Sequence, residues 1–309
     1  MKYLVTGANG FLGQHLCRYL KSKHVDFRAT AREGSQSVYA SGDLNTFNRW
    51  GELLTGISVI VHAAAKAHDL TKSVDLKLKY QQSNFEATQK LAHQAKAYGV
   101  RKFIFISTIK VNGEQTLDQP FTPEDRAQPT DDYGISKMLA EAELLKLHEP
   151  EVFDVVIIRP CLVYGQGVKA NFKNLMKLVE KGWPLPFGLI RNKRSLVSVD
   201  NLVDLIVTCA SHPNAGGQIF LVSDGVDLSL PELIQAIAKS MHRSVRLIPV
   251  PVFLLRIGLT LIGKKEMAQR LFSNLQVDIS KTKRLLNWTP PYSIEQSLQI
   301  MSKGGPNGI

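Results

Sequence analysis

The sequence predicts an α/β protein built on a doubly wound parallel sheet, and three observations support this prediction. Apolar runs of strand length alternate along the first half of the chain with stretches whose apolar residues recur at helical spacing. Each run is apolar almost throughout, as in strands that are buried on both faces of a parallel sheet. The first run also leads through a glycine-rich turn directly into the first helical stretch.

The expected elements follow in chain order. Strands of the main sheet are expected at residues 2–7, 25–30, 58–64, 102–107 and 153–159. Helices are expected between them at 11–22, near 79–98 and at 133–148. After about residue 165 the pattern is less regular, with a helix at 171–182, a Pro-rich loop at 182–188, strands at 195–199 and 218–223, and a helix at 200–210 with Asp200 as its N-cap. We expect the last two strands to return to the main sheet.

Composition and charge limit the classes of partner. The chain has 309 residues, 44% of them hydrophobic, and a net charge of +11. Residues 1–165 hold 20 basic and 18 acidic side chains, whereas residues 166–309 hold 18 and 9, so the excess lies in the second half. Nucleic acid, an anionic membrane surface or a phosphate-bearing small molecule would suit this charge. The chain lacks long basic runs and zinc-finger spacing, and the motifs below favour the small molecule.

The cysteines and apolar segments indicate a cytoplasmic protein without a metal site. Cys17, Cys161 and Cys209 are scattered and show no metal-ligand spacing, which favours buried thiols in a reducing compartment. The N-terminus enters a strand at once, so we expect no export signal. The apolar stretch 249–263 is too short to span a bilayer. We expect it to be a packed helix, although surface association with a membrane is an alternative because Lys264 and Lys265 follow it.

The stretch TGANGFLG at residues 6–13 has the spacing of a dinucleotide-binding loop. Gly7 would permit the tight turn, Gly10 would let the backbone approach a pyrophosphate, and Gly13 would let helix and strand pack closely. The first amides of the following helix would then face the phosphates. We therefore expect a Rossmann-type dinucleotide-binding domain at 1–165, which also takes the strands near 195–223, and a smaller, discontinuous α/β substrate-binding domain at 166–309.

The end of the second strand bears on the choice between NAD and NADP. An acidic residue there would bind the ribose 2′-hydroxyl, but this sequence has Arg32, and a guanidinium suits a 2′-phosphate. NADP is therefore slightly favoured over NAD, although Arg32 is also compatible with an ordinary solvated arginine beside Glu33.

Tyr133 and Lys137 are the candidate catalytic pair. They are four residues apart in an expected helix and so lie on one face, one turn from each other. A nearby ammonium group would stabilise the phenolate and lower the pKa of Tyr133 from its ordinary value of about 10. Such a tyrosine can exchange a proton with an alcohol or ketone while hydride moves.

Taken together, these motifs resemble the extended short-chain dehydrogenase/reductase family, in its nucleotide-sugar epimerase/dehydratase branch. The matching segments are TGANGFLG (6–13), GDL (42–44), VHAAAK (61–66), SNFEAT (83–88), FISTIKVNGE (105–114), YGISK (133–137), IIRPCLVYGQG (158–167), RSLVSVDNL (194–202) and DISKTKRLLNWTP (278–290). They cover almost the whole chain.

The resemblance implies roles for individual residues. Thr108 would bind the substrate oxygen beside Tyr133, and Ser107 would turn toward the cofactor. The 4,6-dehydratases of the family carry Asp and Glu after this threonine, whereas this chain carries Ile109 and Lys110, which argues against loss of water.

Further contacts are implied at other matching positions. The implied cofactor-binding residues are Gly7, Gly10, Phe11, Leu12, Gly13, Arg32, Asp43, Leu44, Ala63, Ala64, Lys66, Asn84, Tyr133, Lys137 and Pro160. The implied substrate-binding residues are Thr108, Asn171, Arg194 and Arg270, the last three toward the nucleotide diphosphate. His62 is expected to be structural.

The resemblance thus implies an NAD(P)-dependent enzyme that acts at C4 of a nucleotide sugar, UDP being the expected carrier, as a 4-epimerase or a 4-keto-sugar reductase. A reductase of a non-sugar alcohol or ketone and a non-catalytic dinucleotide sensor are the alternatives. A homodimer formed through the helices at 79–98 and 133–148 is also expected.

Overall fold

Seven parallel strands form the main sheet of the computed structural model, which describes residues 1–66, 74–168 and 170–303. In spatial order they are β3 (Tyr39–Ala40), β2 (Phe27–Ala31), β1 (Tyr3–Thr6), β4 (Val59–His62), β5 (Lys102–Ile106), β6 (Asp154–Pro160) and β9 (Gln218–Val222). The order reverses direction at β1, which is the doubly wound arrangement. The predicted α/β class and parallel sheet are confirmed.

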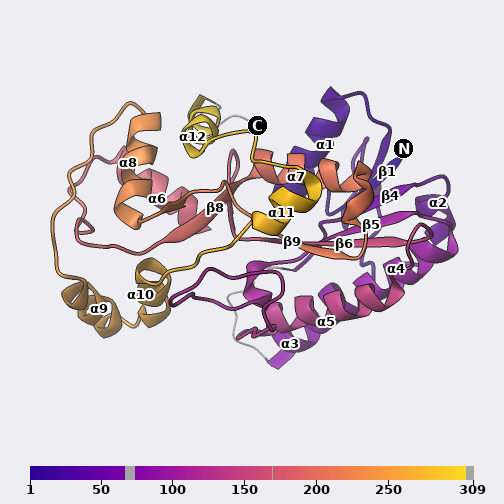
Figure 1. Ribbon diagram of the computed structural model, residues 1–309, viewed down its shortest axis with the longest axis horizontal. Coiled ribbons are helices and arrows are strands. Elements are labelled where there is room, and N and C mark those ends of the chain that lie inside the picture. Colours follow the sequence, from indigo (N-terminus) through magenta and orange to yellow (C-terminus); the bar gives the residue numbers. More distant parts are fainter. Residues whose placement is uncertain (67–73, 169, 304–309) are drawn as a thin grey trace.

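Helices cover both faces of this sheet (Figure 1). One face carries α1 (Phe11–Ser22), α7 (Val199–Ser211) and α11 (Ser280–Leu286), and the other carries α2 (Trp50–Leu54), α3 (Val74–Tyr80), α4 (Ala87–Ala97) and α5 (Asp132–Leu147). Two hydrophobic cores result: the first lies between the sheet and α1, α7 and α11, and the second between the sheet and α2, α4 and α5. Successive strand residues point into opposite cores, so Ile104 lies in the first, and Phe103 and Phe105 lie in the second. This alternation explains why the strands are apolar almost throughout.

The helix predicted near 79–98 is composite. A π-helical segment at Gln81–Glu86 separates α3 from α4 and contains the buried Asn84. Such insertions of one wide turn are often found at functional sites.

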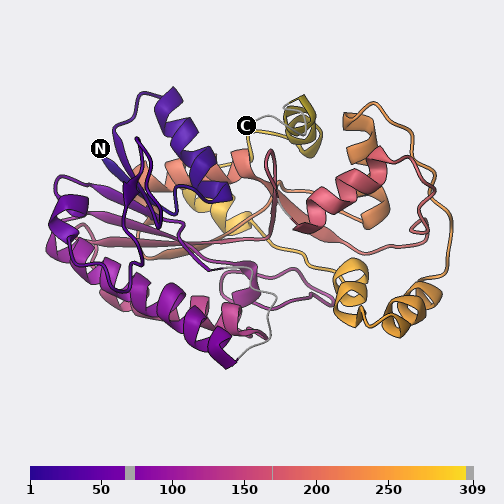
Figure 2. The same cartoon turned by 180° about the vertical axis from the view of Figure 1, so that it is seen from behind.

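A smaller unit lies to one side of the main sheet (Figures 1 and 2). Its sheet contains β10 (Asp227–Leu228), β8 (Arg194–Ser198) and β7 (Leu162–Tyr164), and its helices are α6 (Ala170–Glu180), α8 (Leu230–Ser240), α9 (Val252–Leu261), α10 (Lys265–Phe272) and α12 (Ile294–Lys303). Of the two late strands expected in the main sheet, β9 pairs there with β6, but β8 pairs in the small sheet.

One local prediction is wrong. Ser198, rather than Asp200, caps α7, because its hydroxyl accepts a hydrogen bond from the Asn201 amide while Asp200 already lies within the first turn. The apolar stretch at 249–263 forms the expected helix, α9, whose inner side packs against the core of the smaller unit, while none of its residues is fully buried. Among the described residues, no helix is long and apolar enough to cross a membrane.

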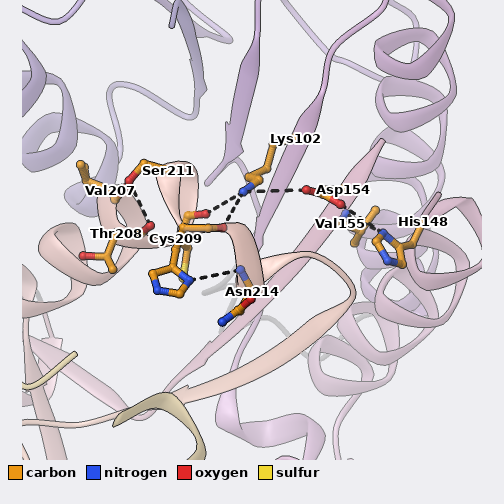
Figure 3. Close-up of polar contacts among 10 residues, drawn as sticks. Lys102, His148, Asp154, Val155, Val207, Thr208, Cys209, Ser211 and Asn214 are labelled. Atoms are coloured by element: carbon orange, nitrogen blue, oxygen red, sulfur yellow. Dashed lines mark hydrogen bonds and ion pairs between the residues drawn. The ribbon is translucent and has the colours of Figure 1, made fainter. Parts of the chain in front are cut away.

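Lys102 joins helix α7 to the sheet edge opposite the strand ends that carry the motifs (Figure 3). Its buried amine donates to the carbonyl oxygens of Cys209 and His212 at 3.2 and 3.1 Å and lies 3.9 Å from Asp154. An ammonium group at a helix C-terminus is stabilised by the carbonyls that the helix leaves unpaired. Burial nevertheless lowers the pKa of Lys102.

Asp224 joins the main sheet to the smaller unit. It follows β9 and accepts hydrogen bonds from the Ser198 amide at 2.9 Å, from Asn201 Nδ2 at 2.7 Å and from the Tyr164 hydroxyl at 2.7 Å. All these groups are largely buried, so the carboxylate satisfies three donors that have little access to water.

We predict that Asp224→Ala lowers the free energy of unfolding by about 3 kcal/mol or more, because several buried donors lose their acceptor. Asp224→Asn keeps the shape and a hydrogen-bonding group at each oxygen position, so it should lose less than half as much. Urea unfolding of the three proteins measures the difference, and equal losses would contradict this role.

Candidate active site

The predicted site residues follow strands whose carboxyl ends meet at one edge of the sheet. Gly7 follows β1, Arg32 follows β2, Ala63 follows β4, Thr108 follows β5, and Pro160 ends β6. Because these strands are parallel and neighbouring, their ends lie together. In doubly wound sheets this edge, near the strand where the order reverses, is where ligands bind.

The glycine loop fits a dinucleotide for steric reasons. Gly7 has a φ of +71°, and a Cβ there would lie 2.7 Å from the Ala64 nitrogen. A Cβ on Gly13 would lie 2.2 Å from the Gly7 oxygen. Gly10 is the N-cap of α1 and uses no side chain for it. The loop therefore leaves backbone exposed at a helix N-terminus, which is the environment that binds phosphate.

The β2 end presents Arg32 and the turn that contains Asp43. Arg32 is exposed, and Asn9 of the glycine loop donates to the Glu33 carbonyl at 3.0 Å, so the two loops are joined. The Asp43 carboxylate accepts from the Asn45 amide at 2.9 Å and remains exposed, while Leu44 is buried beneath it.

His62 is a structural residue in the described geometry. Its ring lies between the Thr6 and Thr88 hydroxyls at 2.6 and 2.9 Å, and it is fully buried. Burial, with a smaller contribution from Lys137, lowers the pKa of His62 to about 3. The neutral ring thus connects β1, β4 and α4. Ala63 and Ala64 follow it, half-buried, beside the glycine loop.

Asn84 positions other groups by hydrogen bonding. Its side chain accepts from the Lys66 amide at 2.8 Å and donates to the Lys66 carbonyl and to the Ser136 hydroxyl, both at 3.1 Å. It therefore fixes the segment after β4 against α5. The cofactor-side role expected of Asn84 and Lys66 stays a prediction.

Tyr133 and Lys137 lie one turn apart at the start of α5. Asp131 caps this helix by accepting from the Gly134 amide at 2.7 Å. The Tyr133 ring packs 5.9 Å from the Tyr80 ring. Lys137 is buried, and its amine donates to the Ile106 carbonyl at 2.8 Å and lies 4.3 Å from the centre of the Phe105 ring.

The pKa shifts differ from those expected from the sequence. Burial is the largest cause that raises the pKa of Tyr133, and Asp131 and Tyr80 add to it. Burial also lowers the pKa of Lys137 to about 7, which Glu141 partly opposes. The net effect of the surroundings is thus a raised pKa of the Tyr133 phenol, while the Lys137 amine donates to the Ile106 carbonyl.

The end of β5 is attached to the same helix. Ser107 donates a very short hydrogen bond to Glu141 in the interior, so it does not turn toward the cofactor as expected. Thr108 is half-buried, and its hydroxyl accepts from the Lys110 amide at 3.3 Å. Of the two hydroxyls, Thr108 is the more exposed.

Ile109 and Lys110 occupy structural positions. Ile109 is buried in the first core. The Lys110 amine pairs with Glu114 at 2.9 Å and, at a shorter distance, with Asp131, the cap of α5. Both carboxylates help to keep the pKa of Lys110 raised despite burial, which lowers it.

Glu141 and Arg159 form a buried ion pair that the sequence analysis missed. Arg159 Nε lies 3.0 and 3.2 Å from the two carboxylate oxygens, and Nη2 lies 2.5 Å from one of them. Arg159 Nη1 donates to Asn112 at 2.9 Å. The available signal was Glu141 itself, an acidic residue two turns after Tyr133 on the same helix face.

On the substrate side, Arg194 begins β8 and donates to the Ser273 carbonyl at 3.2 Å. Asn171 and Arg270 lie on α6 and α10, but their side chains fall outside the described part of the structure. The diphosphate contacts expected of these three residues stay predictions, as do the contacts of Phe11 and Leu12 at the start of α1.

Comparison with known proteins gives consistent results. The family model described as NAD dependent epimerase/dehydratase family matches residues 3–223. A UDP-glucose 4-epimerase from Vibrio cholerae is 45% identical over 304 residues, which cover 96% of this chain and 93% of that protein.

Two solved structures share the fold. UDP-glucose 4-epimerase from Thermotoga maritima, solved with UDP-glucose, has a TM-score of 0.78 at 20% identity and covers 98% of both chains. UDP-glucuronic acid 4-epimerase from Bacillus cereus, in complex with NAD, has a TM-score of 0.76 at 22% identity and covers 98% of this chain and 99% of that one.

The buried His62 predicts a specific pH dependence. Its pKa in the fold is about 3, against about 6.5 in an unfolded chain. Between these values the unfolded state binds a proton that the folded state does not, so stability falls as pH falls, by up to about 1.4 kcal/mol per pH unit.

We therefore expect His62→Gln to be destabilised at pH 7, and its deficit in the free energy of unfolding relative to the wild type to shrink by about 1.6 kcal/mol between pH 6.5 and 5. Urea unfolding across this range measures it. The exposed His93→Gln is the control, and the same narrowing in that variant would contradict the assignment.

Proposed function

Because this chain belongs to the NAD dependent epimerase/dehydratase family, we propose that it is an enzyme that interconverts the C4 epimers of a UDP-linked hexose. The single observation that supports this most strongly is the 45% identity, over nearly the whole of both chains, to a UDP-glucose 4-epimerase. The geometry agrees, since Tyr133 and Lys137 on α5 and Thr108 after β5 lie at the sheet edge that carries the dinucleotide loop.

Each residue has a role that follows from its position. Tyr133 takes the proton of the 4-hydroxyl when the sugar is oxidised and returns it to the 4-keto oxygen when the sugar is reduced. Thr108, the half-buried and more accessible hydroxyl of the β5 end, orients that oxygen. The dinucleotide that the glycine loop would hold would supply hydride transfer, and the positive ring of its oxidised form would favour the phenolate of Tyr133. Lys137 contributes a buried amine one turn from the phenol.

The residues after Thr108 support redox chemistry without loss of water. Removing water from a sugar needs a proton donor and a base near the neighbouring carbons. Ile109 has no ionisable group, and the Lys110 amine is engaged by two carboxylates. This supports the exclusion of a 4,6-dehydratase.

The cofactor is NAD or its 2′-phosphate form. The family is described as NAD dependent. The exposed Arg32 at the β2 end favours NADP, which would suit the second candidate function, a 4-keto-sugar reductase that uses free cofactor. Arg194, Asn171 and Arg270 are the proposed partners of the sugar nucleotide's diphosphate.

Quaternary structure and location complete the proposal. We expect a homodimer through α4 and α5, where Leu139 is 40% exposed on the outer side of α5. The proposed substrate class and the free cysteines support a cytoplasmic location.

Tyr133→Phe tests the reaction. We expect the wild type to convert UDP-glucose or UDP-N-acetylglucosamine to the C4 epimer, and the variant to lose about 100-fold or more of kcat, the usual range for a lost acid–base group. Product formation is followed by chromatography, and dinucleotide binding by fluorescence, which should be retained.

Tyr80→Phe is the matched control, because it removes the hydroxyl of the neighbouring ring. It should stay within a few-fold of the wild type. Full activity of Tyr133→Phe, or equal losses in both variants, would refute the assignment. If the wild type instead reduces a UDP-4-keto-sugar with NADPH and leaves both UDP-sugars unchanged, the reductase is the correct function.

Arg32→Ala tests the cofactor preference. If Arg32 binds a 2′-phosphate, its loss should weaken NADPH binding about tenfold or more, since a hydrogen bond to a charged group contributes about 1.5–3 kcal/mol, while NADH binding stays unchanged. Isothermal titration measures both. Arg101→Ala, an exposed arginine before β5 at the opposite sheet edge, is the control. An unchanged NADPH/NADH ratio in Arg32→Ala would identify Arg32 as a solvated loop residue.

A further inference from the structure

Helix α9 exposes a continuous apolar face. Five large hydrophobic side chains are exposed on it and on the residue that follows: Phe253 (62%), Leu254 (49%), Ile257 (53%), Leu261 (81%) and Ile262 (63%). Phe253, Ile257 and Leu261 are spaced by four and form one row along the helix, with Leu254 beside it. Contiguous apolar surface of this kind marks an interaction site more often than isolated exposed residues do.

The opposite side of α9 is already occupied. Val252, Leu255 and Leu259 pack against the core of the smaller unit. The helix is therefore held in place by one face, and its outer face is directed away from the protein. In both views α9 lies at the end of the molecule farthest from the main sheet, so a flat surface can reach it (Figures 1 and 2).

Within residues 243–264, which include α9, the charge is of one sign. Residues 243–264 contain four basic side chains, Arg243, Arg246, Arg256 and Lys264, and no acidic one. All four are exposed. Arg256 lies on α9 itself, and Lys264 follows it within three residues. An apolar helix face with basic flanks is the pattern of helices that lie in the interface of an anionic bilayer.

We propose that α9 docks the protein on the surface of an anionic lipid bilayer, with Phe253, Leu254, Ile257 and Leu261 in the headgroup and acyl boundary. A second copy of the chain fits this face less well, because two identical faces would bring the four basic side chains of residues 243–264 against those of the copy. The proposal goes beyond the proposed function and does not depend on it.

Docking by α9 would bring the substrate side of the protein close to the membrane. Arg256, Phe272, Ser273 and the loop at 115–118 line a groove of about 320 Å³. The Ser273 carbonyl in this groove accepts the hydrogen bond from Arg194, the proposed diphosphate contact.

Vesicle flotation with the full-length protein tests the proposal. At 0.1 M salt we expect binding to vesicles of phosphatidylcholine with 30% phosphatidylglycerol, and at least about tenfold weaker binding to pure phosphatidylcholine, because each basic residue near the surface contributes roughly 1 kcal/mol. Raising the salt to 0.5 M should reduce binding to the anionic vesicles.

Two variants separate α9 from the rest of the surface. Phe253→Ser/Leu261→Ser should reduce the partition coefficient at least about tenfold, since two large apolar side chains no longer enter the interface. Val152→Ser/Val226→Ser is the matched control, because these valines are 55% and 56% exposed elsewhere, and it should bind as the wild type does.

Circular dichroism and turnover of soluble UDP-sugar, where the wild type shows it, should be unchanged in both variants. Absence of binding to anionic vesicles, or equal binding by the α9 variant, would overturn the proposal whatever the result of the epimerase assays. The proposal would also be overturned if light scattering showed that the wild type is an oligomer and that Phe253→Ser/Leu261→Ser is a monomer. A second copy of the chain would then cover this face.

Discussion

The fixed register between the end of β5 and helix α5 is the constraint on which the candidate site depends. Three polar contacts set it: Lys137 to the Ile106 carbonyl, Ser107 to Glu141, and Lys110 to Asp131. They lie along the first three turns of the helix and along the strand end. A shift of one residue in either element would break all three. The proposed proton-transfer group and the proposed substrate-orienting hydroxyl are therefore held by the same set of contacts.

The buried pair of Glu141 and Arg159 stabilises this register, because a shift would leave two buried charges without their partners. Burying two charges is favourable only if their hydrogen-bonding groups are satisfied. Here Glu141 accepts from Ser107 and from Arg159, and Arg159 also donates to Asn112. The network joins β5, β6 and α5 at the edge of the sheet where the strands end. It also explains why Ser107 faces the interior and leaves Thr108 as the more accessible of the two hydroxyls.

The sequence predicted those features that depend on local pattern. Strands apolar almost throughout and a helical stripe led to β1, β4–β6 and to α1 at Phe11–Ser22, because burial on both faces leaves a clear signature. Prediction from the sequence was wrong where the contact depends on partners that are distant in the chain. Ser107 donates to Glu141, 34 residues away, and β8 pairs with β7 and β10 rather than with a strand of the main sheet. Neither choice leaves a periodic signal. Similarly, the Tyr133–Lys137 spacing predicted proximity but could not reveal that the amine would donate to Ile106.

The two residues that argue against dehydration, Ile109 and Lys110, also help to fix where helix α5 begins. The resemblance implies that family members that remove water carry two acids after the threonine, and acids of that role need to be unpaired. In this chain Ile109 packs into the core, and Lys110 places its amine between Glu114 and Asp131. Asp131 in turn caps α5 through the Gly134 amide, next to Tyr133. A Cβ on Gly134 would lie 3.2 Å from the Lys110 carbonyl, so the loop and the helix start are packed closely. Positions 109 and 110, which would carry the acid and the base in a dehydratase, here hold the loop and the start of the helix that carries Tyr133. This agrees with oxidation and reduction at a single carbon of the sugar.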